Sequence, residues 1–364
     1  MNETLYHLAA APFEAALKVN ILPPGHRARR LHGHSFTARV RAALPEDWSA
    51  DPGGRAEALV QALRKAVKPL DYRDLNTEIE IPTDENLARY VRRCLDVPGL
   101  ETVGIQSTRD QGADLDADEQ AHLWHRFRFE AAHQLPNVPA GHPCGRMHGH
   151  GFEVILHAMQ DVHGQDMGID FDALAALWAP CQEQLHYACL NDLPGLENPT
   201  SELIAQWLWQ RLKPDLPTLS WVTVYETATA GCHFDGTHYR IWKELRFESA
   251  LQLRHAPNGD PRRRLHGHSY LLRLHLSAPL DEVLGWTVDY GDVKALFKPV
   301  YEQLDHHRLD TLPGLADADP GNLVHWIRAQ AGERLPQLDR IDLHHTPGCG
   351  ASLCWGPLGP ALPS

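Results

Sequence analysis

The middle third of the chain shows two kinds of hydrophobic pattern. Residues 124–135 alternate apolar and polar side chains, and residues 148–159 repeat this pattern, so we expect a pair of antiparallel strands. Residues 170–185 place apolar side chains at helical spacing, and residues 199–212 open with Pro-Thr-Ser-Glu, which is typical of a helix start. A last strand is expected at 219–225. The order strand, strand, helix, helix, strand predicts an α+β domain with the helices on one sheet face.

The same pattern occurs three times. The triplet His-Gly-His begins at His32, His148 and His266, at nearly equal intervals. Each triplet follows a Phe-Glu-x-Ala segment at the same distance, and each precedes a segment of the type Leu-Asp/His-Tyr/His. Three landmarks in one order indicate an internal repeat. We expect three tandem domains, at residues 1–112, 123–232 and 241–355, hereafter copies one, two and three.

The segments between the copies are expected to be linkers. The acidic run at residues 113–119 is interpreted as the first linker, and residues 234–237 as the second. A chain of 364 residues is also long enough for two or three separate cores.

Composition narrows the class of protein. The net charge of -13 argues against a nucleic-acid partner, and no apolar run is long enough to cross a membrane. Seven Cys without a Cys-x-x-Cys pair favour reduced thiols, and the start of the chain lacks a basic export signal, so a cytoplasmic location is expected. The count of 24 His is unusual, and the clustering of His in the three triplets is the feature that a functional site would explain.

Three His of copy two have the pattern of a zinc site. Residues i and i+2 of a strand point to one face, so His148 and His150 project together, and His133 can join them from the neighbouring strand. Three imidazoles with one open position are typical of a catalytic Zn²⁺. Copies one and three carry Leu17 and Leu251 where copy two carries His133, so one zinc per chain is expected.

Copy two resembles the 6-pyruvoyl-tetrahydropterin synthase family, and most closely its 6-carboxy-tetrahydropterin synthase branch. The resemblance lies in the segments Phe129–His133, Gly141–His150, Ile169–Phe171, Leu190–Asp192, Pro199–Glu202 and Glu226–Thr227. It implies the tunnelling fold (T-fold), a four-stranded antiparallel sheet with two helices, of which three close into a barrel. Three fused copies would make this pseudo-trimeric barrel from one chain. Two such barrels often stack, which would give a homodimer.

The resemblance also implies a reaction and its residues. The family's substrate is 7,8-dihydroneopterin triphosphate, and the 6-carboxy branch forms 6-carboxy-5,6,7,8-tetrahydropterin, acetaldehyde and triphosphate on the path to queuosine. Cys144 matches the family's proton-shuttling thiolate, and Glu226 matches its pterin anchor. The helper pair, Asp305 and His306, occurs only in copy three. Because the family assembles its site across subunits, we expect one complete site between copies two and three.

Several assignments stay open at this point. Glu202 either touches the ligand or only caps its helix. The arginines at 27–30 and 262–264 are interpreted as solvated loops, with triphosphate binding as the alternative. The alternative functions are a 6-pyruvoyl-type reaction on the same substrate and non-catalytic pterin binding, since two of the three sites are incomplete.

Overall fold

A computed structural model describes residues 3–49, 51–160 and 168–360. Each copy consists of a long hairpin, two helices and a second, shorter hairpin. Copy one comprises β1 (Thr4–Leu17), β2 (His32–Ala42), α1 (Arg55–Val67), α2 (Asp84–Cys94), β4 (Leu100–Thr108) and β5 (Gln111–Leu115). Copy two comprises β6 (Ala121–His133), β7 (His148–Met159), α3 (Phe171–Leu185), α4 (Ser201–Leu212), β9 (Leu219–Thr227) and β10 (Ala230–Phe234). Copy three comprises β11 (Tyr239–Leu251), β12 (His266–Ser277), α5 (Tyr290–Leu304), α6 (Pro320–Ala331), β13 (Leu338–Thr346) and β14 (Cys349–Cys354).

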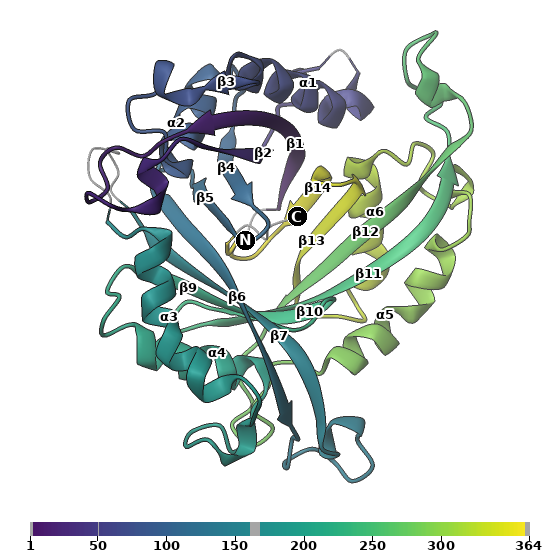
Figure 1. Ribbon diagram of the computed structural model, residues 1–364. Coiled ribbons are helices and arrows are strands. Elements are labelled where there is room, and N and C mark those ends of the chain that lie inside the picture. The colour runs from purple at the N-terminus through teal and green to yellow at the C-terminus, as the bar shows by residue number, and fades with distance from the viewer. Residues whose placement is uncertain (1–2, 50, 161–167, 361–364) are drawn as a thin grey trace.

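These strands form a closed, twelve-stranded antiparallel barrel, and the helices lie outside it (Figure 1). The copies meet edge to edge through the pairs β5–β6 and β10–β11, and the pairing of β14 with β1 closes the ring. Two short strands, β3 (Arg73–Asp74) and β8 (Ala188–Cys189), add parallel to β1 and β6. The expected α+β tunnelling fold of three tandem copies is therefore confirmed.

The helices form because their ends and apolar faces are both satisfied. The Asp170 side chain accepts a hydrogen bond from the Ala173 N–H at the start of α3, and Thr200 does the same for Leu203 at the start of α4. The buried faces of α3 and α4 pack on one side of β6, β7 and β9. Both expected helices and the three expected strands of copy two are thus present.

The two expected linkers were only partly correct. Residues 116–119 and 235–237 do connect successive copies, but residues 113–115 belong to β5 and residue 234 ends β10, which is the fourth strand of its copy. Ala113 and Leu115 are fully buried, and the Asp114 carboxylate lies 3.0 Å from the Arg39 guanidinium. The sequence pattern suggested that Asp114 is exposed to solvent, but it is buried and forms an ion pair with Arg39.

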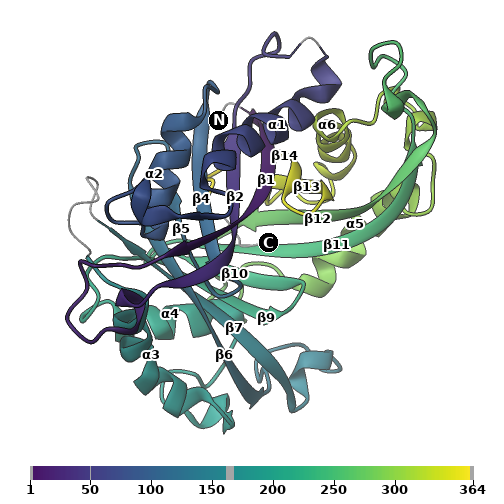
Figure 2. The same cartoon turned by 45° about the horizontal axis from the view of Figure 1, so that its top comes forward.

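Figure 2 shows the barrel from a tilted direction, with the long hairpins β6–β7 and β11–β12 crossing beneath copy one. Each hairpin extends past the neighbouring short strands, so its tip and the loops around it stand at the junction of two copies. Among the described residues, no helix is long and apolar enough to span a membrane.

Candidate metal centre and active site

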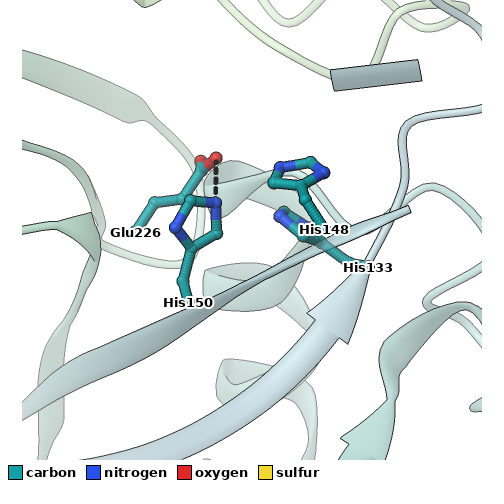
Figure 3. Close-up of side chains that lie close together, drawn as sticks. All are labelled: His133, His148, His150 and Glu226. Carbon is teal, nitrogen blue, oxygen red and sulfur yellow. Dashed lines mark ion pairs between the residues drawn. The ribbon is translucent and has the colours of Figure 1, made fainter. Parts of the chain in front are cut away.

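Three imidazoles and one carboxylate meet near the end of the β6–β7 hairpin where the loop 134–147 connects the two strands. The antiparallel register sets His133 opposite His148 and Ala131 opposite His150, which brings all three imidazoles to one face. The ligand atoms of His133, His148, His150 and Glu226 lie within 4.8 Å of one another (Figure 3). The expected convergence of the three His is therefore what the register produces.

The hydrogen bonds of these imidazoles suit metal binding. His133 Nδ1 lies 3.0 Å from the carbonyl oxygen of Pro199, and His148 Nδ1 lies 2.8 Å from that of Arg146. A carbonyl can only accept, so each Nδ1 carries the proton and each Nε2 keeps its lone pair. The Nε2 atoms of His133 and His150 are buried without a hydrogen-bond partner. Burial lowers the pKa of His133 to about 4, so the ring is neutral near pH 7. This donor set fits Zn²⁺.

Copies one and three lack the third imidazole at the same register. Leu17 faces His32 across the β1–β2 hairpin, and Leu251 faces His266 across β11–β12. Both leucines are buried in the cores of their own copies. Within residues 3–49, 51–160 and 168–360, copy two holds the one cluster of His, Cys, Asp or Glu with the spacing of a metal site.

Glu226, which was expected to anchor the pterin in the same site, also lies among the possible metal donors. Its Oε1 lies 3.6 Å from His150 Nε2, near the end of β9. Burial, followed by the negative charges of Glu202 and Asp289, raises its pKa to about 7. The carboxyl is thus placed either to complete a metal shell or to accept donors from a ligand beside the metal.

Cys144 lies in the short 3-10 turn Pro143–Gly145 between β6 and β7. His142 precedes this turn, and its Nδ1 accepts a hydrogen bond of 3.2 Å from the Cys144 N–H. The thiol is partly buried, and burial together with the charges of Glu226 and Asp289 raises its pKa. The Cys144 thiol therefore shares its surroundings with Glu226 and with a residue of copy three.

Copy three forms the other wall of this region. Asp289 Oδ2 lies 3.3 Å from His142 Nε2, and the Thr200 hydroxyl donates to the carbonyl oxygen of Gly285. Sequence reasoning did not single out Asp289. A signal was present, because Asp289 opens its helix as Asp170 does in copy two.

The Glu202 side chain forms hydrogen bonds across the junction of copies two and three. It is only 2 % exposed, and its Oε1 accepts hydrogen bonds from the Thr287 N–H at 2.8 Å and the Thr287 hydroxyl at 3.1 Å. Its Oε2 accepts from the Ser201 hydroxyl at 3.1 Å. Thr200, and not Glu202, provides the side-chain cap of α4. Glu202 therefore ties copy two to copy three beside the cluster.

The Asp305–His306 pair lies at the end of α5. Asp305 Oδ1 accepts from the Glu248 N–H at 3.0 Å, and Asp305 Oδ2 lies 3.0 Å from His306 Nδ1. His306 has a left-handed backbone (φ 58), and its side chain is 77 % exposed. The contacts described for these two side chains are within copy three, so the structure does not bring them into contact with Cys144.

The position of this pair on the sheet nevertheless faces copy two. The strand β11 uses one edge for β12 along its whole length and the other edge for β10 only over residues 239–243. The segment after α5 therefore pairs with the remaining part of the second edge, as the parallel bridge between Ala250 and Arg308 shows. That edge is the one shared with copy two.

Two of the arginines that were expected to lie in solvated loops form ion pairs with a neighbouring copy, although the Arg27 side chain stays 66% exposed. Arg27 pairs with the Asp172 carboxylate of copy two. Arg262 pairs with Asp51 and, at 3.3 Å, with Glu57 of copy one. These guanidinium groups connect neighbouring copies, and the acidic partners were invisible as such in the sequence because they lie about half a chain away.

A family model and several known proteins are similar to this chain. The family model described as 6-pyruvoyl tetrahydropterin synthase matches residues 9–114, 122–237 and 240–354. A Synechocystis protein, 6-carboxy-5,6,7,8-tetrahydropterin synthase, is 38% identical over 119 residues, which cover 31% of this chain and 91% of the relative. Among solved structures, Caenorhabditis elegans 6-pyruvoyl tetrahydropterin synthase matches with a TM-score of 0.29 and 16% identity, over 32% of this chain and 95% of its own. Arthrobacter globiformis uricase matches with a TM-score of 0.35 and 7% identity, over 79% of this chain and 96% of its own.

Proposed function

Because the chain belongs to the 6-pyruvoyl tetrahydropterin synthase family, we propose that it is a 6-carboxytetrahydropterin synthase with one active site, between copies two and three. The substrate would be 7,8-dihydroneopterin triphosphate, and the products 6-carboxy-5,6,7,8-tetrahydropterin, acetaldehyde and triphosphate. This would make the enzyme a carbon–carbon lyase of queuosine biosynthesis. The observation that carries the proposal is the donor cluster of copy two, which lies beside Cys144 and against copy three.

His133, His148 and His150 would hold a Zn²⁺ ion. Two buried Nε2 atoms without a partner support this assignment, because such atoms are costly unless a ligand uses them. Bound zinc acts as a Lewis acid on substrate oxygens and lowers the pKa of a nearby hydroxyl. Its positive charge also opposes the effect of Glu226 and Asp289 on the Cys144 thiol.

Cys144 would serve as the base that removes a proton from the substrate side chain. A thiolate near a cation and an imidazole can perform this task near pH 7. Cys144 would return this proton at a later step, and His306, oriented by Asp305, would assist the shuttle. The exposed imidazole and the 3.0 Å contact within the pair support this role, as does its place on the edge of β11 that copy two shares.

Glu226 would bind the pterin ring. A carboxylate offers two acceptors to the ring N3–H and the 2-amino group, a bidentate match. Its neighbours in the cluster would place that ring beside the metal. Glu202 would act as a positioning residue, because its oxygens already accept hydrogen bonds from Thr287 and Ser201.

Product analysis tests this function. Zinc-loaded protein is incubated with 7,8-dihydroneopterin triphosphate, and the products are identified by mass spectrometry and by trapping acetaldehyde. The expected result is 6-carboxytetrahydropterin with one acetaldehyde per turnover. A 6-pyruvoyl product without acetaldehyde would assign the sibling reaction, and unchanged substrate that remains bound would assign a pterin-binding protein.

The variant Cys144→Ala assigns the base. It should abolish turnover and leave the zinc content at one ion per chain, because the thiol is not among the cluster's donors. The variant Cys181→Ala is the matched control, since this buried thiol packs in the core of copy two. Near-normal turnover by Cys144→Ala would remove Cys144 from the mechanism.

A further inference from the structure

Copy one has a cavity at the position equivalent to the His cluster of copy two. The cavity has a volume of about 710 Å³ and lies at the junction of copies one and two. Copy one contributes His26, His34 and Asp84 to its lining, and copy two contributes Ile169 and Phe171. A volume of this size suits a small organic ligand.

The cavity corresponds to the copy-two site residue by residue. His26 precedes its 3-10 turn as His142 does. His26 Nε2 lies 3.7 Å from Asp170 and 3.0 Å from Asp172, and His142 Nε2 lies 3.3 Å from Asp289, the counterpart of Asp170 in copy three. Leu17 replaces the third imidazole, and Ala28 occupies the position of Cys144. The cavity therefore lacks the third imidazole and the thiol of copy two, while a volume of about 710 Å³ remains open at this junction.

The carboxyl group has been exchanged between two facing positions. Copy two has Ser201 at the start of α4 and Glu226 on the strand, whereas copy one has Asp84 at the start of α2 and Ser107 on the strand. The two positions are in contact in copy one, because the Ser107 hydroxyl donates to Asp84 Oδ2 at 2.6 Å. One carboxyl at this place is thus lost from the strand and regained from the helix.

Asp84 has unused hydrogen-bonding capacity. It is only 7 % exposed, and it lines the cavity. Its Oδ2 accepts a hydrogen bond from the Ser107 hydroxyl, and because the carboxyl lines the cavity and has further lone pairs, it can accept donors from a ligand. Burial, together with the neighbouring Glu85 carboxyl in the same cavity, raises its pKa to about 8. A buried carboxyl of this kind is costly unless a ligand supplies donors.

We propose that the cavity of copy one is a second, non-catalytic binding site for a planar heterocycle with a 2-amino-4-oxopyrimidine ring. Such a ring presents an N–H and an adjacent amino group, which match the carboxyl oxygens of Asp84. The side chains of Phe171, Ile169 and Leu123 supply apolar walls for its faces. Pterins and guanine share this ring edge, so both are candidate sources. The site uses no residue of the copy-two centre and does not depend on turnover.

Binding stoichiometry tests the proposal. The full zinc-loaded chain is titrated with 6-carboxypterin and, separately, with guanosine by isothermal titration calorimetry. The variant Asp84→Ser should lose one equivalent of the heterocycle that binds at copy one, with unchanged zinc content and unchanged turnover. The variant Asp84→Ser/Ser107→Glu restores the arrangement of copy two and should regain that equivalent, which separates ligand binding from folding.

The outcomes are decisive. Loss of an equivalent for 6-carboxypterin alone identifies a pterin site, and loss for guanosine alone identifies a guanine site. If Asp84→Ser binds both compounds as the unaltered chain does, or if the unaltered chain binds neither compound outside copy two, the proposal is wrong. Failure of the proposed synthase would remove turnover and the copy-two equivalent, while the equivalent that depends on Asp84 would persist.

Discussion

Asp289 of copy three lies 3.3 Å from Nε2 of His142 in copy two, and the same Asp caps helix α5 through the N–H groups of Gly291 and Asp292. One carboxylate thus fixes a helix start and contacts the residue whose Nδ1 holds the backbone of Cys144. The environment of this thiol is therefore set by two copies together, and it can be altered from copy three without touching copy two.

The first prediction concerns this contact. Replacement Asp289→Asn keeps a capping side chain but removes a negative charge that raises the Cys144 pKa, so the thiol pKa should fall. The rate of Cys144 alkylation by iodoacetamide, measured against pH, should shift to lower pH. Asp170→Asn is the matched control, because Asp170 caps α3 and faces His26 at the other junction. A shift of the same size in both variants would contradict the proposed charge effect.

The second prediction concerns the metal. His133→Leu introduces the residue that copies one and three carry, and it should reduce zinc from one ion per chain to none, as measured by elemental analysis. The reverse change, Leu251→His, places a third imidazole opposite His266 and near His268, so it should add a second ion. Zinc retained by His133→Leu would show that the ion is held elsewhere.

The third prediction separates catalysis from structure at Asp305. Asp305 and Asp71 accept equivalent backbone hydrogen bonds, from Glu248 at 3.0 Å and from Glu14 at 2.9 Å. Asp305→Asn should lower kcat by about 10²-fold, in the range for loss of general acid–base assistance, whereas Asp71→Asn should cost only stability. Steady-state kinetics and thermal melts provide the measurements. Equal kcat in the two variants would leave Asp305 with a structural role alone.

The fourth prediction concerns pH and stability. The pKa of Asp84 is raised by burial from 3.8 to about 8, so the folded state favours its neutral form. The resulting contribution to stability is complete below about pH 4 and is lost as the pH rises toward 8, by at most about 1.4 kcal/mol per pH unit. Asp84→Asn cannot ionise and should flatten this decline in urea unfolding between pH 5 and 8. The exposed Asp118→Asn control should leave the slope unchanged.

Local pattern in the sequence was sufficient to predict the repeats and the convergence of three imidazoles in copy two. His148 and His150 lie on one face because side chains in a strand alternate with a period of two residues. The preceding antiparallel strand places His133 directly opposite His148. The capped helices α3 and α4 follow from Asp170 and Thr200 for the same local reason.

Tertiary structure alone decided what lies around those imidazoles. The pairing of copies two and three through β10 and β11 brings Asp289 to His142 and Thr287 to Glu202, across separations that no short-range pattern encodes. Within copy one, the sheet buries Asp114 beside Arg39, so part of an apparent acidic linker is a strand. Long-range ion pairs and cavities depend on which faces the three copies present to each other. Copy one has Ser107 at the position of Glu226 and Asp84 at the position of Ser201. Only the structure shows that these two positions are in contact, with the Ser107 hydroxyl 2.6 Å from Asp84 Oδ2.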